Sequence, residues 1–477
     1  MRLDRDKLRS FQKNRKFNKR SKLQLIRNLK KASSSTLFSV SGSQKTKKHS
    51  KSKILVSAIL LFITLGILVL SFGLIFTRSY LFLPSTKSAS GKEDVINNKD
   101  IIIDIGLESR ISKVISIEDG FVAVGSTITD ENEKYQILLV KIDETGEIIW
   151  TKLFGADGDD FGYDVISLDD GFLVLGTTSS KSLGVSGRYD AYVVRLAENG
   201  NVVWDKSFGG PDWDRAYKIS KVEDKFVFVG DNYAKGKDVT QNFGEHDYWI
   251  VAFSNEGKII WDRSFGGVRW DRAYAVGYDA KNKQIIVAGS SNSFTDGTRY
   301  DGYVVSYDIN GNLLWQTVLT NSQTLWPMDL YVTADSIFVG GYVYEFSNAP
   351  NSEKLGTEKA FIAKLSLNGE VEYVKTFGEN VRIHSVICNS QNQGQELHDV
   401  VYFAGYKYDY EKKVPWYGVF EFNRNSNLVN IFEKTVDTEY GMLFSISRDE
   451  KRNVFILSGS IMDNGKMKGL IRFLSDI

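Results

Sequence analysis

Along most of the chain after residue 100, apolar and polar residues alternate in short runs bounded by turn residues, a pattern that predicts β-strands. Residues 163–210 show the repeating unit clearly. An apolar strand with an acidic turn (YDVISLDD) leads to a strand that closes with glycine (GFLVLGTTSS), and a polar loop follows. An alternating strand (YDAYVVRLAE), an Asn-Gly turn and a strand containing tryptophan (NVVWDKSFGG) complete the unit. Each unit therefore predicts four antiparallel strands.

The unit recurs at a nearly fixed spacing. Residues 204–217 read WDKSFGGPDWDRAY, and residues 261–274 read WDRSFGGVRWDRAY, with 11 of 14 positions identical. Repeats of this size are typical of folds in which each small sheet buries its faces against its neighbours. We therefore expect residues 101–477 to form an all-β, seven-bladed β-propeller. Seven glycines, 51 to 65 residues apart, close the second strand of successive units: Gly125, Gly176, Gly230, Gly289, Gly340, Gly405 and Gly459.

The two ends of the repeat region predict how the ring closes. The seventh unit stops after its third strand, whereas an apolar piece at 101–105 precedes the first complete unit. We expect this N-terminal strand to supply the missing fourth strand of the last blade. Turns such as Asn199-Gly200 and Asn310-Gly311 predict tight hairpins in which both central residues have positive φ.

A charge-free apolar run precedes the repeats. It extends from Ile54 to Phe76, and its 23 residues would form a helix about 35 Å long, enough to cross a hydrocarbon core of about 30 Å. The run is too long for the apolar part of a cleaved signal peptide, and no small-residue cleavage site follows it. It predicts one transmembrane signal-anchor helix over residues 54–77.

Charge is divided unevenly between the two ends of the chain. Residues 1–53 hold 18 Lys and Arg against two Asp, a charge of +16, which leaves −15 for the rest of a chain whose total is +1. Because the basic excess precedes the apolar run, we expect a cytoplasmic tail and an extracytoplasmic body at the cell membrane. The tail is predicted to be disordered, with an amphipathic helix on anionic lipid as the alternative. Nothing in it is specific to nucleic acid, and residues 78–100 have the composition of a flexible linker.

Few residues suggest catalysis or metal binding. Cys388 is the only cysteine, which rules out an intrachain disulfide, and the four histidines lack metal-ligand spacing. The chain contains neither a G-x-S-x-G nor an H-E-x-x-H motif, so we expect no cofactor and no enzyme activity. One acidic cluster is an alternative calcium site, although it lacks the EF-hand pattern: Asp157, Asp159, Asp160 and Asp164.

The repeats resemble those of a broad bacterial family of extracytoplasmic propellers, distantly similar to WD-repeat and quinoprotein-like propellers. The units read roughly W-x-K-x-F-G-G, then D-x-A/G, then D-G-F/Y-x-x-x-G, and they weaken where Tyr373 or Phe432 replaces tryptophan. This resemblance implies a binding or scaffold module. Residues 143–150 (DETGEIIW) also resemble the tryptophan-docking motif of quinoprotein dehydrogenases, with a spacing that differs by one residue.

Loop length indicates which end of the propeller binds a ligand. The second-to-third connections are long, with extremes at 231–246 and 342–358, and they share a face with the blade-to-blade connections. We call this end the long-loop face and the opposite end the tight-turn face. Binding residues concentrate on long loops held by a rigid scaffold. The predicted binding residues on the long-loop face are Trp213, Asp214, Arg215, Trp270, Asp271, Arg272 and Trp326.

Two interpretations of these residues stay open. Tryptophan and arginine favour binding of a protein or a wall polysaccharide, because they bury much area and keep a polar group. Alternatively, the aspartates accept backbone N–H groups and the arginines pair with carboxylates, so that both join neighbouring blades. We expect a binding or scaffold module. A propeller enzyme, quinoprotein-like or polysaccharide-acting, and the ectodomain of an envelope sensor are the alternatives.

Overall fold

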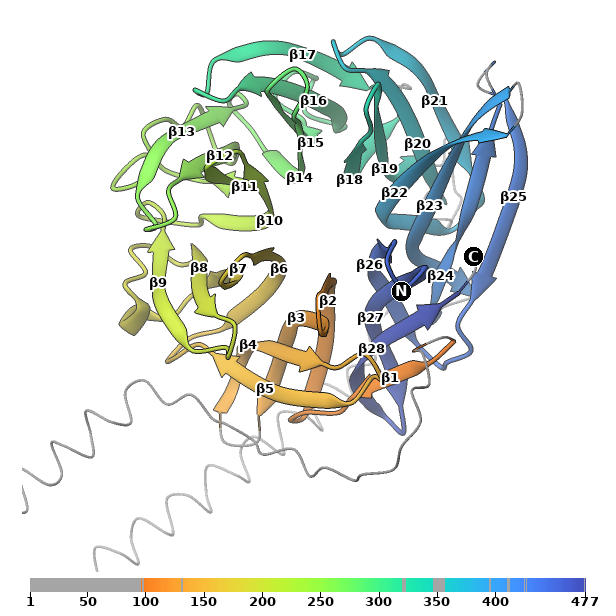
Figure 1. The fold of residues 1–477 in the computed structure, drawn as a ribbon. Coiled ribbons are helices and arrows are strands. Elements are labelled where there is room, and N and C mark those ends of the chain that lie inside the picture. Colours follow the sequence, from red (N-terminus) through yellow and green to blue (C-terminus); the bar gives the residue numbers. More distant parts are fainter. Residues whose placement is uncertain are drawn as a thin grey trace, which may run out of the picture. The chain divides into compact units, whose positions relative to one another are not determined.

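The described part of the chain is a ring of seven antiparallel sheets (Figure 1). Each sheet has four strands, with its first strand nearest the axis, and we number these blades in chain order. The predicted all-β, seven-bladed propeller is therefore confirmed, and the helical element among these residues is a single 3-10 turn, Lys181–Leu183. The computed structural model describes Ile96 and residues 98–477 except 130–131, 320–322, 346–356, 394–395, 410–411, 424, 426 and 476.

The first four blades follow one another along the chain. Blade 1 contains β2 (Glu108–Ile117), β3 (Gly120–Thr129), β4 (Asn132–Ile142) and β5 (Ile148–Phe154). Blade 2 contains β6 (Asp160–Leu168), β7 (Gly171–Thr178), β8 (Asp190–Ala197) and β9 (Val202–Phe208). Blade 3 contains β10 (Arg215–Val222), β11 (Lys225–Asn232), β12 (Asp247–Phe253) and β13 (Ile259–Phe265). Blade 4 contains β14 (Asp271–Asp279), β15 (Gln284–Ser291), β16 (Asp301–Asp308) and β17 (Leu313–Leu319).

The last three blades include the one that joins the two ends of the repeat region. Blade 5 contains β18 (Thr324–Val332), β19 (Ser336–Glu345), β20 (Thr357–Ser366) and β21 (Val371–Phe377). Blade 6 contains β22 (Val381–Gln393), β23 (Glu396–Asp409), β24 (Lys412–Phe422) and β25 (Leu428–Thr435). Blade 7 contains β26 (Gly441–Asp449), β27 (Val454–Asp463), β28 (Lys466–Leu474) and β1 (Asp100–Ile103).

Ring closure by the N-terminal strand is confirmed. β1 pairs antiparallel with β28, with Asp100 opposite Arg472 and Ile103 opposite Gly469. Two hydrogen bonds of 2.7 and 2.6 Å join the Arg472 guanidinium to the Asp100 carboxylate. The Ile103 side chain is fully buried in an apolar cluster that blades 7 and 1 share. The other six clusters likewise each lie between two adjacent blades, so packing between blades holds the ring together.

The outermost strand of one blade packs on a turn of the next. The Trp204 ring lies against Gly257, where a Cβ would come within 3.1 Å of it. Trp204 Nε1 donates to the Asn255 carbonyl at 2.9 Å, and Lys206 Nζ donates to the Gly257 carbonyl at 2.8 Å. The same ring-on-glycine contact recurs at three further pairs: Trp150 with Gly200, Trp261 with Gly311, and Trp315 with Gly369. This blade lock accounts for the W-x-K spacing of the repeat.

The third-to-fourth turns differ from the predicted type, as the turn of blade 1 shows. Gly146 has a φ of 89°, but Thr145 before it does not have positive φ. The amide of Gly146 donates to the Asp143 carbonyl at 3.1 Å, and the amide of Asp143 donates to the Glu147 carbonyl at 2.9 Å. The carboxylate of Asp143 accepts two further backbone N–H groups of this loop. The side-chain cap stabilises a longer loop with one left-handed glycine, so the prediction of two positive-φ residues was wrong.

Every innermost strand carries a β-bulge at the same point. In β10, Ala216 pairs with Gly230 and Lys218 with Val229, which leaves Tyr217 as the extra, half-buried residue. A bulge re-aims a side chain and bends its strand. The extra residues of the other blades are also half-buried: Ser112, Tyr163, Tyr274, Met328, His384 and Phe444.

The repeated glycines make room for these bulges. A Cβ on Gly230 would lie 1.8 Å from the backbone oxygen of Arg215, a distance that no side chain tolerates. In blade 5 the glycine in this position is Gly341, whose Cβ would lie 2.0 Å from the Trp326 oxygen. The assignment of Gly340 to this repeat position was therefore wrong by one residue, because two glycines are adjacent here and the sequence does not show the register.

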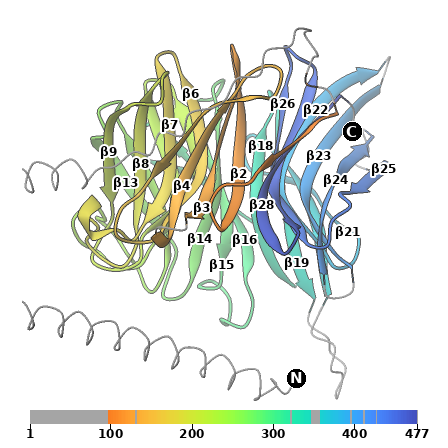
Figure 2. The ribbon, with the colours of Figure 1, turned by 90° about the horizontal axis from the view of Figure 1, so that it is seen from below.

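Long second-to-third connections are present in only four of the blades. They cover 179–189, 233–246, 292–300 and 346–356 in blades 2 to 5, whereas two residues separate the corresponding strands of blades 1, 6 and 7. The expectation of long connections throughout was wrong for those three blades, whose second and third strands extend as hairpins instead. Figure 2 shows the blades from the side, with their strands running between the two faces.

The predicted membrane and tail segments lie outside the described residues. This applies to the basic tail at 1–53, the apolar run at 54–76 and nearly all of the linker at 78–100. None of the residues that the structure describes belongs to a helix of the length and hydrophobicity that a bilayer requires.

We predict that deletion of residues 101–105 prevents the ring from closing, because blade 7 then lacks its fourth strand and the cluster shared with blade 1 is opened. Purified full-length protein with the deletion should lose the cooperative thermal unfolding transition, measured by circular dichroism at strand wavelengths. A cooperative transition at the wild-type temperature would show that β1 is dispensable.

A pair of substitutions in β1 tests the same contact without deletion. Ile103 is fully buried and Ile102 is 40% exposed. Ile103→Ala should lower the free energy of unfolding by about 2–5 kcal/mol, and Ile102→Ala by less than about 0.5 kcal/mol. Urea unfolding measures both, and equal effects of the two variants would contradict the closure described above.

Candidate functional site

A buried carboxylate organises the long-loop face at blades 3 and 4. Asp231, at the end of β11, is fully buried and lies opposite Arg215 in the strand register. Its oxygens accept hydrogen bonds from Arg215 Nη2 and the Tyr217 hydroxyl, both at 2.8 Å, and one lies 2.6 Å from His246 Nδ1. Arg272 of the next blade approaches the same carboxylate at 3.9 Å. One anion thus fixes groups from two blades.

The charge of Asp231 is itself stabilised by these partners. Burial opposes ionisation, but the His246 hydrogen bond and the charges of Arg215 and Arg272 hold the pKa of Asp231 below its usual value. Two arginines share this one carboxylate, and the Nε atoms of both are buried without a hydrogen-bond partner among the described residues. The local balance of charge is therefore positive.

The two tryptophans of the repeated motif flank this carboxylate. Trp213 stacks on Tyr189 with ring centroids 5.0 Å apart, and the Arg215 guanidinium lies 5.6 Å from its ring centre. Trp270 is 37% exposed, its ring lies 4.5 Å from that of His246, and Arg272 lies 4.6 Å from it. Both tryptophans also form isolated parallel bridges to the preceding blade, at Tyr189 and His246.

The same chemistry continues around the ring into blades 5 and 6. Trp326, half-buried on β18, lies between the rings of Tyr300 and Tyr342, at 5.4 and 5.0 Å. The Arg382 guanidinium is 4.0 Å from the Tyr342 ring and forms a two-point ion pair with Glu358. We name the whole set the aromatic–cation arc: Trp213, Arg215, Trp270, Arg272, Trp326, Tyr342, Arg382, Tyr406 and Lys413.

Blade 6 adds a second positive region to the arc. Lys413 lies 4.8 Å from the Tyr406 ring and has no carboxylate within ion-pair distance among the described residues. Arg382 lies 5.7 Å from the same ring. Beneath them, burial lowers the pKa of His384 to about 4, and the nearby cations add to that shift, so this histidine is neutral at pH 7. Among the described residues of this region, Glu358 therefore supplies one carboxylate for the two cations Arg382 and Lys413.

The two predicted aspartates of the motif are buried and bind backbone groups. Asp214 accepts the Gly210 amide at 2.7 Å, and Asp271 accepts the Gly267 amide at 2.8 Å and the Ser293 hydroxyl at 2.6 Å. Both side chains are 0% exposed. They hold the blade-to-blade loops in place, which agrees with the blade-joining interpretation of the aspartates, while the tryptophans and arginines remain half-exposed around them.

Burial raises the pKa of two aspartates on the long-loop face, Asp214 and Asp247. Burial raises the pKa of Asp214 to about 7, the Gly210 amide opposes the shift, and the charge of Asp190 adds to it. Burial likewise raises the pKa of Asp247 to about 6, with the Phe243 amide opposing and the charge of Asp271 adding. These groups hold a proton more strongly in the folded protein than in the unfolded chain.

The acidic cluster of blade 2 is divided among separate contacts. Asp160 is buried and bonds the hydroxyls of Thr178 and Ser180, whereas the exposed Asp157 bonds Ser182. Within the described part of the chain, no three acidic, histidine or cysteine side chains are gathered in a way that suits a metal ion.

Five of the nine arc residues were predicted from the sequence, and the remaining four were missed: Tyr342, Arg382, Tyr406 and Lys413. Asp231 and His246, which hold the arc at blades 3 and 4, were missed as well. A signal for four of the missed residues was present. Arg382 occupies the place in its innermost strand, two residues before the bulge, that Arg215 and Arg272 occupy in theirs. Asp231, Tyr342 and Tyr406 each follow the second-strand glycine and pair across the ladder with that place.

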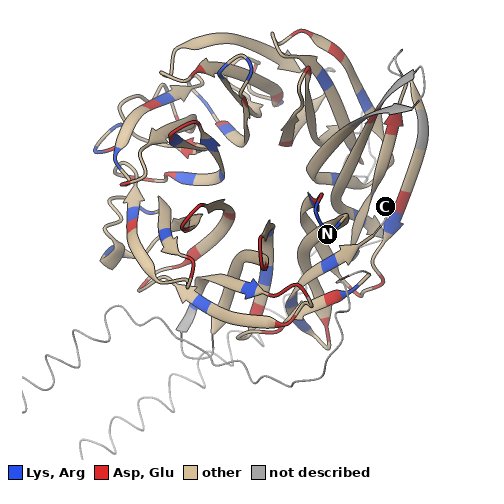
Figure 3. Ribbon diagram, in the orientation of Figure 1, with Lys and Arg blue, Asp and Glu red and all other residues tan. Residues whose placement is uncertain are grey.

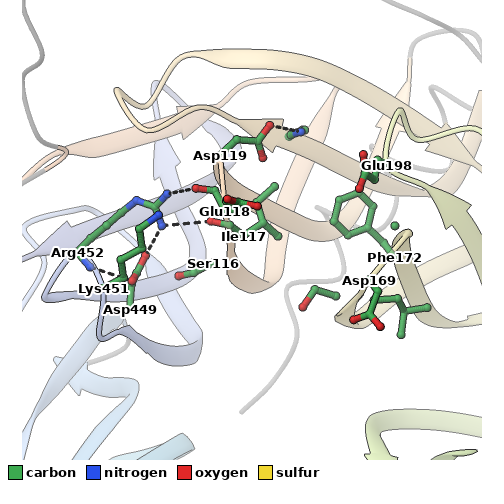
Figure 4. A pocket seen from close by; sticks show the side chains of 14 residues that line it. Ser116, Ile117, Glu118, Asp119, Asp169, Phe172, Glu198, Asp449, Lys451 and Arg452 are labelled. Carbon is green, nitrogen blue, oxygen red and sulfur yellow. Dashed lines mark hydrogen bonds and ion pairs between the residues drawn. The ribbon is translucent and has the colours of Figure 1, made fainter. Parts of the chain in front are cut away.

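The tight-turn face also carries a cavity, of about 740 Å³, at blades 7, 1 and 2 (Figure 4). One side is built from Arg452, which donates to the carbonyls of Ile117 and Glu118 at 3.2 and 2.9 Å and pairs with Asp449 at 2.7 Å. These bonds tie blade 7 to blade 1, so this wall of the cavity is part of the ring closure.

Comparisons with known proteins identify the architecture only. No family model and no curated protein matches the chain. Among solved structures, the Neurospora crassa Pan2 WD40 domain is similar at 10% identity, over 76% of this chain and 89% of that one, with a TM-score of 0.45. The β-propeller domain of the Trilobed protease from Pyrococcus furiosus is similar at 9% identity, over 78% and 94%, with a TM-score of 0.42. Such likenesses concern the fold alone.

We predict that Asp214→Asn makes stability less dependent on pH. An unfolded aspartate loses its proton near pH 4, whereas Asp214 keeps it to about pH 7. The wild-type free energy of unfolding therefore loses this contribution as pH rises from about 4 to about 7, because the unfolded state binds fewer protons.

Urea unfolding at about pH 5 and about pH 8 measures this difference. The wild type should lose more stability over the interval than Asp214→Asn, and Glu118→Gln on an exposed turn is the matched control. The quantity compared is the change in the free energy of unfolding between the two pH values. A general loss of stability in Asp214→Asn lowers both values and does not affect this change. Parallel curves for wild type and Asp214→Asn would contradict the raised pKa.

Proposed function

We propose that this protein is a membrane-anchored, extracytoplasmic binding module that captures a protein partner on its long-loop face. The aromatic–cation arc is the observation that supports this most. Tryptophan, tyrosine and arginine dominate binding hot spots, because they bury large areas and keep polar groups available. Here they lie along one face of four adjoining blades, with the tryptophans and arginines half-exposed and the tyrosines Tyr342 and Tyr406 buried behind them.

The contacts within the arc favour a protein over a sugar polymer. A sugar ring stacks on a free aromatic face, but Trp326 is packed between Tyr300 and Tyr342, and Trp213 is stacked on Tyr189. The guanidinium groups of the arc remain available to a partner, and the planar arrangement of their N–H donors matches the geometry of a carboxylate. Cation–π contacts and ion pairs hold these side chains in place, which reduces the entropy lost on binding. A partner with acidic side chains fits this surface.

The place where the linker joins the propeller supports the choice of face. Lys99 Nζ donates to the Thr145 carbonyl at 2.8 Å, in the third-to-fourth turn of blade 1. The described residues immediately before β1 therefore lie at the tight-turn face, so the chain enters the propeller at the end opposite the arc. The apolar run from Ile54 to Phe76 would anchor the chain, with the basic tail in the cytoplasm.

We predict that Trp270→Ala weakens partner binding at least about tenfold, because it removes an aromatic anchor from the arc. Full-length protein in detergent is immobilised, proteins captured from an envelope extract are identified, and the affinity of each purified candidate is measured. Tyr331→Ala is the matched control, since Tyr331 is 38% exposed against 37% for Trp270 and lies on the tight-turn face.

The outcomes separate the possible binding modes. Loss of affinity in Trp270→Ala, with wild-type affinity in Tyr331→Ala, would support the proposal. Equal affinities would place the partner away from the arc. Retention of wall polysaccharide, with no protein that binds at micromolar concentration, would contradict a protein partner and leave the propeller as a sugar-binding module.

The membrane topology has its own test. Ser182 is exposed on the long-loop face, and Ser35 lies in the basic tail. Single cysteines at these positions, in a Cys388→Ser background, are treated in intact cells with a membrane-impermeant thiol reagent. Ser182→Cys should react and Ser35→Cys should react only after lysis. Reaction of the tail cysteine in intact cells would contradict the proposed orientation.

A further inference from the structure

A second cavity lies at the axis, on the tight-turn side. Its volume is about 420 Å³, within the range of small-molecule sites. Blades 1, 3, 5, 6 and 7 all contribute to it, mainly through their innermost strands. Acidic and basic residues both occur on the strands nearest the axis (Figure 3). The cavity is separate from the arc, because its lining residues follow the bulges whereas those of the arc precede them.

An ion pair across the axis forms part of this cavity. Lys218 of blade 3 lies 3.0 Å from Asp329 of blade 5, two blades away. The other oxygen of Asp329 accepts the Ser385 hydroxyl at 2.7 Å and the Val386 amide at 3.1 Å. Asp164, nearby on β6, accepts the amides of Val165 and Ile219 at 3.0 Å each. The carboxylates of Asp329 and Asp164 thus already accept hydrogen bonds from other groups.

Lys113 brings a cation that no described carboxylate contacts directly. Its side chain lines the cavity from β2, and among the described residues its ammonium group makes no hydrogen bond and no ion pair. Burial and the neighbouring charge of Lys218 lower the pKa of Lys113, and the charges of Asp164 and Asp329 oppose this. An unpaired ammonium in such a place costs free energy unless an anion joins it.

The other two cations of the cavity, Lys218 and Arg448, are each paired with a carboxylate. Arg448 also lines it, and its partner Glu450, at 3.4 Å, has a side chain that is 76% exposed. With Asp164 nearby, three carboxylates balance these three cations, but no carboxylate of a described residue lies within ion-pair distance of Lys113. Arg448 Nε is buried and has no hydrogen bond within the described part of the chain. Its ion pair with Glu450 engages this atom, so Lys113 is the unpaired cation among the described residues that line the cavity.

The rest of the lining is largely apolar or aromatic, and Asn389 and Ser447 add polar groups. It includes Leu330, Tyr331, Val386, Ile446 and Tyr402, whose ring packs on that of Phe455 at 4.5 Å. A ligand that fits this lining combines one negative charge with a compact apolar body. A phosphate dianion would bring two negative charges to the single unpaired cation, Lys113, and a neutral molecule would leave Lys113 unpaired.

We propose that this axial cavity binds a small organic monocarboxylate, with its carboxylate on Lys113 and its apolar body against the wall formed by blades 5 to 7. The site is independent of the long-loop face and of any partner bound there. It makes the propeller a two-site protein, with a small acid at the axis and a macromolecule on the opposite face.

Calorimetric titration of the full-length protein in detergent tests this directly, with phenylacetate, hexanoate and acetate as probes. Phenylacetate or hexanoate should bind, and acetate should bind more weakly because it lacks the apolar body. Phenylacetamide, the uncharged analogue, should bind at least about tenfold more weakly than phenylacetate. Inorganic phosphate, tested in the same way, should not compete.

Matched variants locate the site. Lys113→Met should weaken phenylacetate binding at least about tenfold, whereas Lys221→Met, an exposed lysine outside the cavity, should leave it unchanged. Ile387→Trp fills the cavity without removing charge, and it should abolish binding even if Lys113→Met folds poorly. Failure of all three acids to bind at about 10 mM, or equal binding by wild type and both cavity variants, would overturn the proposal.

Discussion

The contact on which the ring depends is the ring-on-glycine lock between successive blades. A glycine is required there for two reasons, since its φ is positive and any Cβ would meet the tryptophan ring. The lysine two residues after the tryptophan then bonds the carbonyl of that glycine, as Lys206 does at Gly257. The tryptophan, the lysine, the turn and the glycine of the repeat therefore take part in one and the same interaction.

This lock also shows how the ring closes where the repeat changes. At the junction of blades 7 and 1, the Ile101 side chain takes the place of tryptophan against Gly146, and Lys99 bonds the Thr145 carbonyl. The tryptophan of the motif that resembles quinoprotein dehydrogenases, Trp150, packs on Gly200 in the same manner. Its similarity to a docking motif is accounted for by blade packing, without any reference to a cofactor.

The sequence was sufficient for the fold because its evidence is local and repeated. The alternation of apolar and polar residues, the regular glycines and the missing fourth strand remain recognisable in the later units, where the sequence similarity between repeats is weaker. Register is different, because it depends on which residue of one strand faces which residue of another. The choice between Gly340 and Gly341, and the cap that Asp143 places on its turn, were decided by such contacts.

The candidate site was harder to predict for the same reason. Trp213 and Trp270 stood out because they repeat, yet Asp231, which holds Arg215 and approaches Arg272, occurs once. A repeat fold offers seven equivalent positions around its axis, and packing requires similar residues in all of them. Function requires them to differ. Positions that depart from the repeat and remain half-exposed, as Trp326 does in blade 5 where blades 3, 4 and 6 have arginine, therefore carry more information about binding than the repeated motif itself.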